Sequence, residues 1–345
     1  MKKINGKRMV SLMLMLIMAI AAVAGCTKQA EEEPKEDILS ENIIITETGE
    51  VLEREEAVST QEPVVMEETA TPENIMLEEP LTVPEPEQVV TEEDQREPKG
   101  NELQLVFLGD SIFDTNRDGT GVPYLTSVAC EADVYNLAIG GTCAAIEPEE
   151  SAAYSEWTST SLVGVVNAIM GRVPTDVFEG KVAKEILDNP NIDFSQTDYF
   201  IIEYGMNDFL RATPLDSESG EIYNLKTYAG ALRYAVANLG GYATDATIII
   251  CSPNYAQFYD GDRMVGEGNM LNNGYGPLAN YAGISNYVAK EYQTLFFNAF
   301  LDLGIDAYTA DEYLEDGIHL TEAGRQRYAD ALAKIILNYE ETKNN

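Results

Sequence analysis

The stretch LVFLGDSIFDTNRDG, residues 105–119, carries an apolar run that ends abruptly in glycine, aspartate and serine. The apolar run predicts a strand over 103–109 that is buried on both faces, as strands of parallel sheets are. Ser111 follows this strand directly, where parallel α/β sheets place their reactive groups. The stretch therefore predicts a strand that leads into a functional turn.

The second half of this stretch, DTNRDG, spaces its oxygen-bearing residues like the start of an EF-type calcium loop. Such a loop needs a bidentate carboxylate at its twelfth position, and a loop that starts at Asp114 has Leu125 there. Asp, Asn and Gly are also ordinary turn-forming residues. We therefore predict a polar loop over 114–120 that binds no metal, with Arg117 bracing the site.

From Leu103 onward, short apolar runs alternate with stretches of helical periodicity. This alternation predicts one α/β domain over 101–345, with a parallel sheet covered by helices on both faces. The domain is long enough to bury a substantial core. The predicted strands are 103–109, 133–139, 198–205, 246–252 and 305–308; the predicted helices are 176–189, 225–240, 285–304 and a last one that follows the N-cap residue Thr321.

Glycines and polar residues gather next to the predicted strands. Ser111 follows the first strand, Gly140-Gly141 the second and GMND (205–208) the third, while DGIHL (316–320) precedes the last helix. Sites in parallel sheets lie outside the carboxyl ends of the strands, so these segments are expected to converge. His319 is the single histidine of the chain.

This ordered set of motifs resembles the SGNH, or GDSL-type, hydrolase family over essentially all of 103–345. The resemblance implies Ser111 as the nucleophile, Asp316 and His319 as its acid–base partners, and Gly141 and Asn207 as oxyanion-hole residues. It also implies a flavodoxin-like three-layer α/β/α sandwich with a central parallel sheet of about five strands, and an esterase that needs no cofactor.

Two positions depart from the family pattern. Ile112 stands where the name-giving leucine would be, and Leu320 stands where a proline often follows the histidine. The second block, NLAIGG, fits the family's spacing in a way that selects Gly141 rather than Gly140 for the oxyanion hole.

The chemistry of these side chains agrees with the implied roles. A serine hydroxyl is a weak nucleophile that needs an adjacent base, and an imidazole can accept its proton near neutral pH. Asp316 can orient the imidazole of His319 and stabilise the imidazolium. Backbone N–H groups of Ser111 and Gly141, with the amide of Asn207, can stabilise a tetrahedral oxyanion.

Other enzyme classes lack their motifs. The chain has no G-x-S-x-G elbow, no H-E-x-x-H or paired-cysteine zinc motif and no phosphate-binding G-x-x-x-x-G-K-[ST] loop. A formal charge of −37 argues against nucleic acid as a partner, because phosphate backbones bind clustered Lys and Arg. Asp110 and Asp208, beside the candidate site residues, are interpreted as hydrogen-bond acceptors that brace loops.

The first hundred residues predict export and tethering. A positive start and an apolar run of about 16 residues, too short to span a membrane, indicate a signal peptide over 1–25. VAGC resembles the lipobox of bacterial lipoproteins, which predicts lipidation of Cys26 and anchoring on the outer face of the cytoplasmic membrane. Residues 26–100, rich in Glu and Pro, predict a disordered tether.

The remaining cysteines, Cys130, Cys143 and Cys251, are odd in number and do not indicate a disulfide framework. Buried, unpaired thiols are the preferred interpretation, and a Cys130–Cys143 bridge stays open.

Two long insertions, 143–175 with Trp157 and 253–283 with several tyrosines, are expected to shape the substrate pocket. The aromatic residues of the second insertion suit sugar rings, although such loops also pack on themselves. We expect a cell-surface esterase that removes short acyl groups, especially O-acetyl, from a glycan. The alternatives are a lipase or lysophospholipase of the same family and a surface lipoprotein that binds its ligand without turnover.

Overall fold

A computed structural model of the protein describes residues 103–343. The predicted signal peptide (1–25), the lipidation site Cys26 and the tether (26–100) lie outside the described residues and stay predictions. The fold below is therefore that of the predicted hydrolase domain.

Five parallel strands form the central sheet in the order β2-β1-β3-β4-β7. Chain order reverses between β1 and β3, which creates the switch point where ligands bind in doubly wound sheets. The three middle strands have almost completely buried side chains, because helices cover both faces. The strands are β1 (Leu103–Gly109), β2 (Ala132–Asn136), β3 (Tyr199–Glu203), β4 (Thr247–Cys251) and β7 (Leu295–Phe297).

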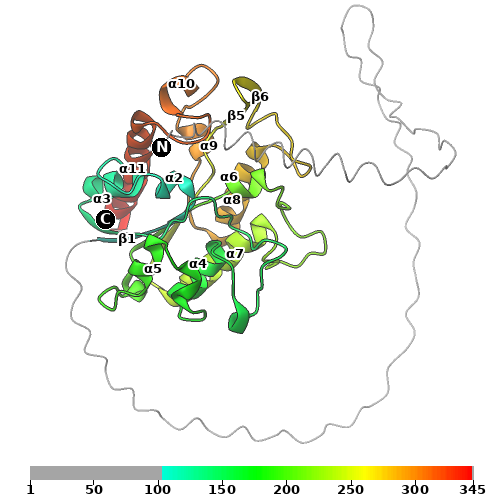
Figure 1. The fold of residues 1–345 in the computed structure, drawn as a ribbon. Coiled ribbons are helices and arrows are strands. Elements are labelled where there is room, and N and C mark those ends of the chain that lie inside the picture. Colours follow the sequence, from blue (N-terminus) through cyan, green and yellow to red (C-terminus); the bar gives the residue numbers. More distant parts are fainter. Residues whose placement is uncertain (1–102, 344–345) are drawn as a thin grey trace, which may run out of the picture. The chain divides into compact units, whose positions relative to one another are not determined.

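Helices form a layer on each side of this sheet. In Figure 1, α3 and α11 lie together on one side, whereas α4 and α7 lie on the other, where α8 also packs against α7. This arrangement confirms the predicted flavodoxin-like three-layer sandwich. The α-helices are α2 (Ser111–Asp114), α3 (Val122–Cys130), α4 (Leu162–Ile169), α5 (Val182–Leu187), α6 (Met206–Leu210), α7 (Tyr228–Tyr242), α8 (Leu278–Tyr292), α9 (Ala299–Asp302), α10 (Ala310–Tyr313) and α11 (Glu322–Lys343); short 3₁₀ turns are η1 (Tyr154–Glu156), η2 (Thr175–Phe178) and η3 (Phe194–Gln196).

The predicted cap of the last helix is confirmed. The hydroxyl of Thr321 accepts a hydrogen bond of 3.1 Å from the N–H of Gly324 at the start of α11. This bond satisfies one of the N–H groups that the first turn of a helix leaves unpaired.

The fifth strand was placed wrongly. Residues 305–308 form a turn, and the strand is β7, inside the region predicted as one helix over 285–304. Gln293, with a left-handed φ of 56°, ends α8 and turns the chain into β7, whose three residues pair with β4. The helical periodicity correctly predicted α8, but it did not distinguish the three-residue strand that follows this helix.

The insertion 253–283 is not an open loop. It contains the antiparallel hairpin of β5 (Gln257–Asp260) and β6 (Arg263–Glu267) and the first turn of α8. Tyr255, Phe258 and Tyr281 are buried, and the rings of Phe209 and Phe258 lie 5.2 Å apart. Of the two interpretations of these aromatic residues, packing inside the protein is correct for these three, and their ring contacts are with aromatic residues outside the insertion, such as Phe209 and Phe300.

Trp157 of the other insertion is also buried, and its indole N–H donates to the carbonyl of Ser159 at 2.7 Å. It therefore offers no exposed stacking face. All three cysteines of the described domain are buried free thiols, which confirms the preferred interpretation over a Cys130–Cys143 bridge. Within residues 103–343, no helix is long and apolar enough to cross a membrane.

Candidate active site

The nucleophile position lies where β1 turns into α2. Asp110 caps this short helix by accepting the N–H of Ile112 at 3.0 Å. Gly109 is required here, because a Cβ at this position would lie only 2.7 Å from the ring of Phe113. Tight packing of the turn thus holds Ser111 at the carboxyl end of β1.

A short closed loop carries Asp316 and His319. Leu314 and Leu320 form an isolated antiparallel bridge at its base, and the N–H of Glu315 donates to the carbonyl of His319 at 2.7 Å. The loop is therefore held in one conformation just before α11.

The β5–β6 hairpin supports this loop from outside. The N–H of Gln257 donates to the carbonyl of Gly317 at 2.7 Å. Gly317 has φ of 91°, and a Cβ there would lie 2.2 Å from the carbonyl oxygen of Gln257, so only glycine fits. Part of the predicted pocket-forming insertion thus buttresses the histidine loop.

Three predicted site residues meet in one hydrogen-bonded chain. The Oγ of Ser111 lies 2.9 Å from Nε2 of His319, and Nδ1 of His319 lies 2.8 Å from Oδ2 of Asp316. The other carboxylate oxygen of Asp316 accepts the N–H groups of Ile318 at 3.0 Å and of His319 at 2.9 Å. These distances suit proton transfer from serine to imidazole.

The charge state of Asp316 fixes which atoms donate and which accept in these hydrogen bonds. Burial alone would raise the pKa of Asp316, but the hydrogen bond and charge of His319, with the two backbone N–H groups, lower it to about 2. An ionised carboxylate has only acceptors, so Nδ1 of His319 must donate and Nε2 is left to accept the serine proton.

The pKa of His319 is raised. Burial opposes the imidazolium, but the hydrogen bond and charge of Asp316 outweigh it, with help from the negative charges of Asp110 and Glu315. A raised pKa makes His319 a stronger base toward Ser111.

Asp110 joins the nucleophile turn to the predicted oxyanion residue. Its Oδ2 accepts a hydrogen bond of 3.0 Å from Nδ2 of Asn207, and both side chains are buried. Burial raises the pKa of Asp110 to about 6, and hydrogen bonds from Ile112 and Asn207 and the charge of His319 partly offset this. The predicted bracing role of Asp110 is confirmed.

Asp208 braces the second block in the same way. Its buried carboxylate accepts the N–H groups of Ala144 at 2.8 Å and Ala145 at 3.2 Å, just after the Gly140-Gly141 turn. Two adjacent residues, Asn207 and Asp208, therefore bind the turns that follow β1 and β2.

The DTNRDG loop is an internal brace. Arg117 donates to Oδ1 of Asp114 at 2.6 Å and to the carbonyl of Asn136 at 2.9 Å, while Oδ2 of Asp114 accepts the N–H of Gly140 at 2.7 Å. The predicted polar loop and the bracing role of Arg117 are confirmed. Because the N–H of Gly140 is occupied, Gly141, with φ of 82°, stays the candidate oxyanion donor.

Two further residues at the site were missed by sequence reasoning. Arg211 donates to the carbonyl of Gly141 at 2.8 Å and pairs with Glu147. Glu203, the last residue of β3, is fully buried beside Asp110. Its position at the end of a strand could have singled it out, but a lone acidic residue in an apolar run has no motif.

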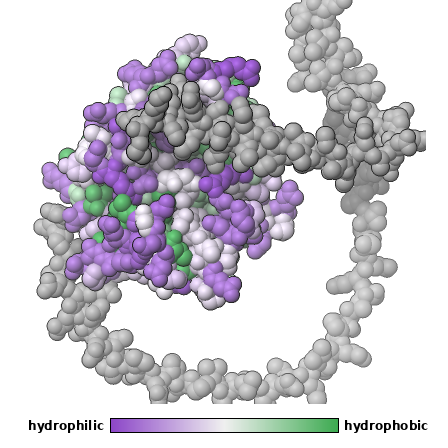
Figure 2. Space-filling model, viewed as in Figure 1, coloured by the Kyte–Doolittle hydropathy of each residue, from purple (hydrophilic) through white to green (hydrophobic). Residues whose placement is uncertain are grey.

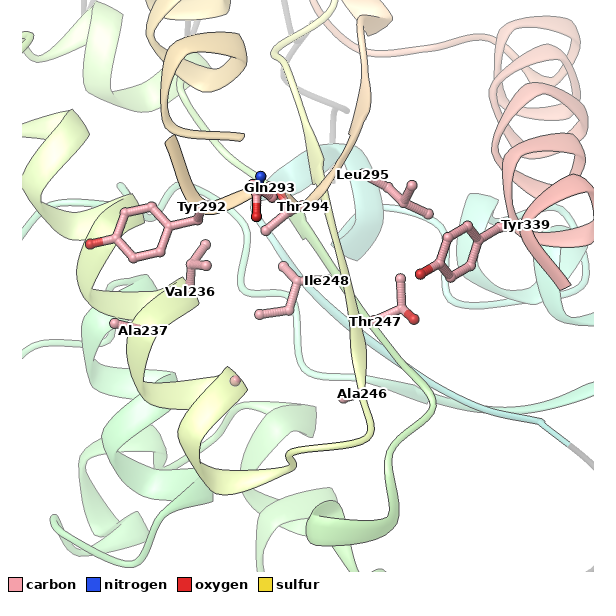
Figure 3. A pocket seen from close by; sticks show the side chains of 11 residues that line it. Val236, Ala237, Ala246, Thr247, Ile248, Tyr292, Gln293, Thr294, Leu295 and Tyr339 are labelled. Carbon is pink, nitrogen blue, oxygen red and sulfur yellow. The ribbon is translucent and has the colours of Figure 1, made fainter. Parts of the chain in front are cut away.

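Three cavities of very different size lie in the described domain, and two of them adjoin these residues. The hollow that Ser111 and His319 line has a volume of about 10 Å³, and a cavity of about 210 Å³ lies beside Gly140 and Gly141. A larger one of about 420 Å³ lies at the amino ends of β4 and β7, between Tyr292 and Tyr339 (Figure 3). That cavity is at the edge of the sheet opposite to Ser111 and has no part in its chemistry.

A serine hydroxyl, an imidazole and a carboxylate, joined in this order at the carboxyl edge of a parallel sheet, define the class of serine-dependent hydrolases. The sequence model of the GDSL-like lipase/acylhydrolase family matches residues 105–332. The chain therefore belongs to this family of carboxylic ester hydrolases. No curated protein matches the chain.

Solved structures share the fold at low identity. One crystal structure is 19% identical in sequence, and it superposes with a TM-score of 0.52. The match covers 68% of this chain and 95% of the chain in that structure. A possible lipase from Chitinophaga pinensis is 15% identical, with coverage of 69% and 99% and a TM-score of 0.48. A family two carbohydrate esterase from Clostridium thermocellum, in complex with cellohexaose, is 17% identical, with coverage of 71% and 66% and a TM-score of 0.44. Such likenesses show the fold alone.

Proposed function

We propose that this protein is a cell-surface serine esterase that removes short acyl groups, O-acetyl above all, from a neutral glycan. The observation that carries the esterase chemistry is the chain from Ser111 Oγ through His319 to Asp316, with distances of 2.9 and 2.8 Å. Membership of the GDSL-like lipase/acylhydrolase family supports the same reaction.

Hydrolysis takes two steps at these residues. The Oγ of Ser111 attacks the ester carbonyl carbon while its proton moves to Nε2 of His319. The tetrahedral adduct expels the alcohol, which takes that proton and leaves an acyl group on Ser111. Water then loses a proton to His319 and attacks the acyl carbon, which releases the carboxylic acid and returns the proton to Ser111. Asp316 stays ionised throughout.

The oxyanion of each adduct is stabilised by N–H groups of Ser111, Gly141 and Asn207. The amide nitrogen of Asn207 has two hydrogens, and Asp110 binds one of them at 3.0 Å. The second hydrogen is the one that we assign to the oxyanion. Asp110 thus fixes the amide before substrate arrives, so no reorganisation is needed in the transition state.

The small hollow at the nucleophile supports short acyl groups. A volume of about 10 Å³ is close to the space for one water molecule, so a long acyl chain does not fit inside it. In Figure 2, the described residues that are in view are mainly hydrophilic, with only small hydrophobic patches. The small volume of the hollow favours an acetyl group over the chain of a lipase substrate.

A series of nitrophenyl esters from two to twelve acyl carbons tests the acyl preference. We expect the highest kcat/KM for acetyl or propionyl esters and a fall beyond butyryl. A lipase with an apolar groove would instead gain up to about 0.8 kcal/mol for each buried methylene. A maximum at eight carbons or beyond contradicts the glycan deacetylase. Ser111→Ala measures the rate of ester hydrolysis that does not depend on the nucleophile. If wild type hydrolyses the esters no faster than this variant, Ser111 is not catalytic and a binding lipoprotein is favoured.

The location is proposed from the sequence alone. A lipobox cysteine at Cys26 after a short apolar run supports export and lipid anchoring outside the cytoplasmic membrane. Metabolic labelling with a fatty acid analogue should mark the wild-type protein in the membrane fraction and not Cys26→Ser. Equal labelling of both proteins contradicts the anchor.

A further inference from the structure

A polar cavity of about 210 Å³ adjoins the nucleophile on the side of the loop after β2. Gly140 forms the shared wall, because a Cβ placed there would lie 3.7 Å from the Cβ of Ser111. The cavity is below the about 300–1,000 Å³ that encloses drug-sized ligands. It is therefore suited to one ring-sized part of a substrate whose ester lies at Ser111.

Charges of both signs line this cavity. Arg211 and Lys181 are opposite in charge to Glu147 and Glu150. Arg211 is committed to Glu147 and to the carbonyl of Gly141, so it serves as a fixed wall. Lys181 is exposed and forms no ion pair with another residue that the structure describes, which leaves its ammonium group to donate to a ligand.

We propose that this cavity binds a neutral, hydroxyl-rich sugar ring, the glycan unit that bears the acyl group, an inference that rests on the glycan esterase function proposed above. Sugar hydroxyls both donate and accept, so separate hydroxyls of one ring can bind the ammonium of Lys181 and the carboxylate of Glu150. Glu150 keeps acceptor capacity for this, because a carboxylate has several acceptor sites and the N–H of Glu147 takes one of them, on Oε2, at 2.9 Å. A phosphate or sulfate group would be repelled by the negative charges of Glu147 and Glu150, which line the cavity. An alkyl chain would desolvate charged side chains without replacing their hydrogen bonds.

The test compares one substrate that has a sugar ring with one that lacks it. The probes are mono-O-acetylated methyl glucosides and nitrophenyl acetate, and the readout is the ratio of their kcat/KM values. Lys181→Met removes one charged donor and should lower this ratio about 10- to 100-fold, as expected for a hydrogen bond to a charged group. Lys290→Met, an exposed lysine outside the cavity, is the matched control and should keep the wild-type ratio.

The outcomes distinguish failure of the proposed sugar site from failure of the proposed esterase function. If wild type and Lys181→Met cleave the acetylated glucosides equally well, the sugar site is overturned while the esterase stands. If wild type cleaves nitrophenyl acetate but no acetylated glucoside, both the sugar site and the glycan substrate are overturned. A higher kcat/KM on an acetylated methyl glucuronide than on the acetylated glucoside overturns the proposal that the bound sugar is neutral.

A separate observation concerns Glu203. This side chain is fully buried, and within the described part of the chain neither of its carboxyl oxygens has a hydrogen-bond donor. Its register partner in β1 is Gly109, which directly precedes Asp110. Two buried carboxyl groups side by side cannot both ionise at low cost, because like charges repel strongly away from water.

We infer that Glu203 is a positioning residue that holds a proton and donates it in a hydrogen bond to Asp110, so that Asp110 keeps Asn207 aimed at the oxyanion. Burial raises the pKa of Glu203 well above its usual range, and the negative charge of Asp110 adds to this. A protonated carboxyl group supplies the O–H donor that the bond requires.

Substitution of Glu203 distinguishes positioning from packing. Glu203→Gln keeps a donor of the same shape, and kcat should stay within about threefold of wild type. Glu203→Leu removes the donor, and kcat on nitrophenyl acetate should fall at least tenfold with KM little changed, because the oxyanion bond acts mainly in the transition state. Equal kcat values for the two variants, at equal folded fractions measured by thermal melting, overturn the inference.

Discussion

Replacement of Asp316 by asparagine tests the proton path with almost no change of shape. The amide oxygen of Asp316→Asn can still accept the N–H groups of Ile318 and His319, which now bind Oδ1 at 3.0 and 2.9 Å. The amide NH₂ then takes the place of Oδ2, 2.8 Å from Nδ1 of His319. Two donors would face each other, so the imidazole must move its proton to Nε2.

A proton on Nε2 removes the base. The Oγ of Ser111, at 2.9 Å, would face an N–H group that cannot accept its proton. Loss of the correct tautomer in a serine triad lowers kcat about 10⁴-fold, which equals about 5 kcal/mol of transition-state stabilisation. KM should change little, because Asp316 does not contact the substrate in the proposed mechanism.

The assay is kcat and KM on nitrophenyl acetate for wild type, Asp316→Asn and the control Asp311→Asn. Asp311 is exposed in α10 on the same segment, so its variant should keep wild-type kcat. A kcat for Asp316→Asn within tenfold of wild type would refute the assigned tautomer and the orienting role of Asp316.

Four further outcomes are expected. Asn207→Ala should lower kcat about 10²–10³-fold with KM nearly constant, and an unchanged kcat would assign Asn207 to structure. A chelator should leave activity and melting temperature unchanged, because Asp114 is already bound by Arg117 and Gly140; calcium-dependent stabilisation would revive the cation site. As the single histidine, His319 should give one NMR titration in untagged protein with a midpoint above about 6.5, because Asp316 raises its pKa. Because the pKa of His319 is higher in the folded protein, protonated His319 adds to the free energy of unfolding below about pH 6.5, and this contribution is lost as pH rises through the folded pKa. The difference in free energy of unfolding between wild type and His319→Gln should therefore close at alkaline pH. An NMR midpoint below 6.5 contradicts the raised pKa.

The sequence predicted the catalytic positions well because they are tied to strand ends. Ser111 and Asn207 lie within four residues after the apolar runs that form β1 and β3, and the parallel sheet brings those strand ends together. His319 could be placed because it precedes a helix with a clear N-cap at Thr321. Local signals were enough wherever they reflected a regular element.

Elements that depend on tertiary contacts were missed. The three residues of β7 are held by pairing with β4, and nothing in their periodicity separates them from the helix before them. The hairpin of β5 and β6 was predicted only as part of a long pocket-shaping loop, although it packs against the histidine loop through Gln257 and Gly317. The role of Arg211 depends on a contact with Gly141, seventy residues away in sequence.

The most direct measurement of the central claim is the site of acyl transfer. Wild-type protein mixed with nitrophenyl acetate, quenched in acid within one turnover and digested, should carry one acetyl group on the peptide that contains Ser111. His319→Ala and Ser111→Ala should carry none, because the first lacks the base and the second lacks the nucleophile. Acetylation of another residue in step with turnover, or full hydrolysis by Ser111→Ala, would contradict the account.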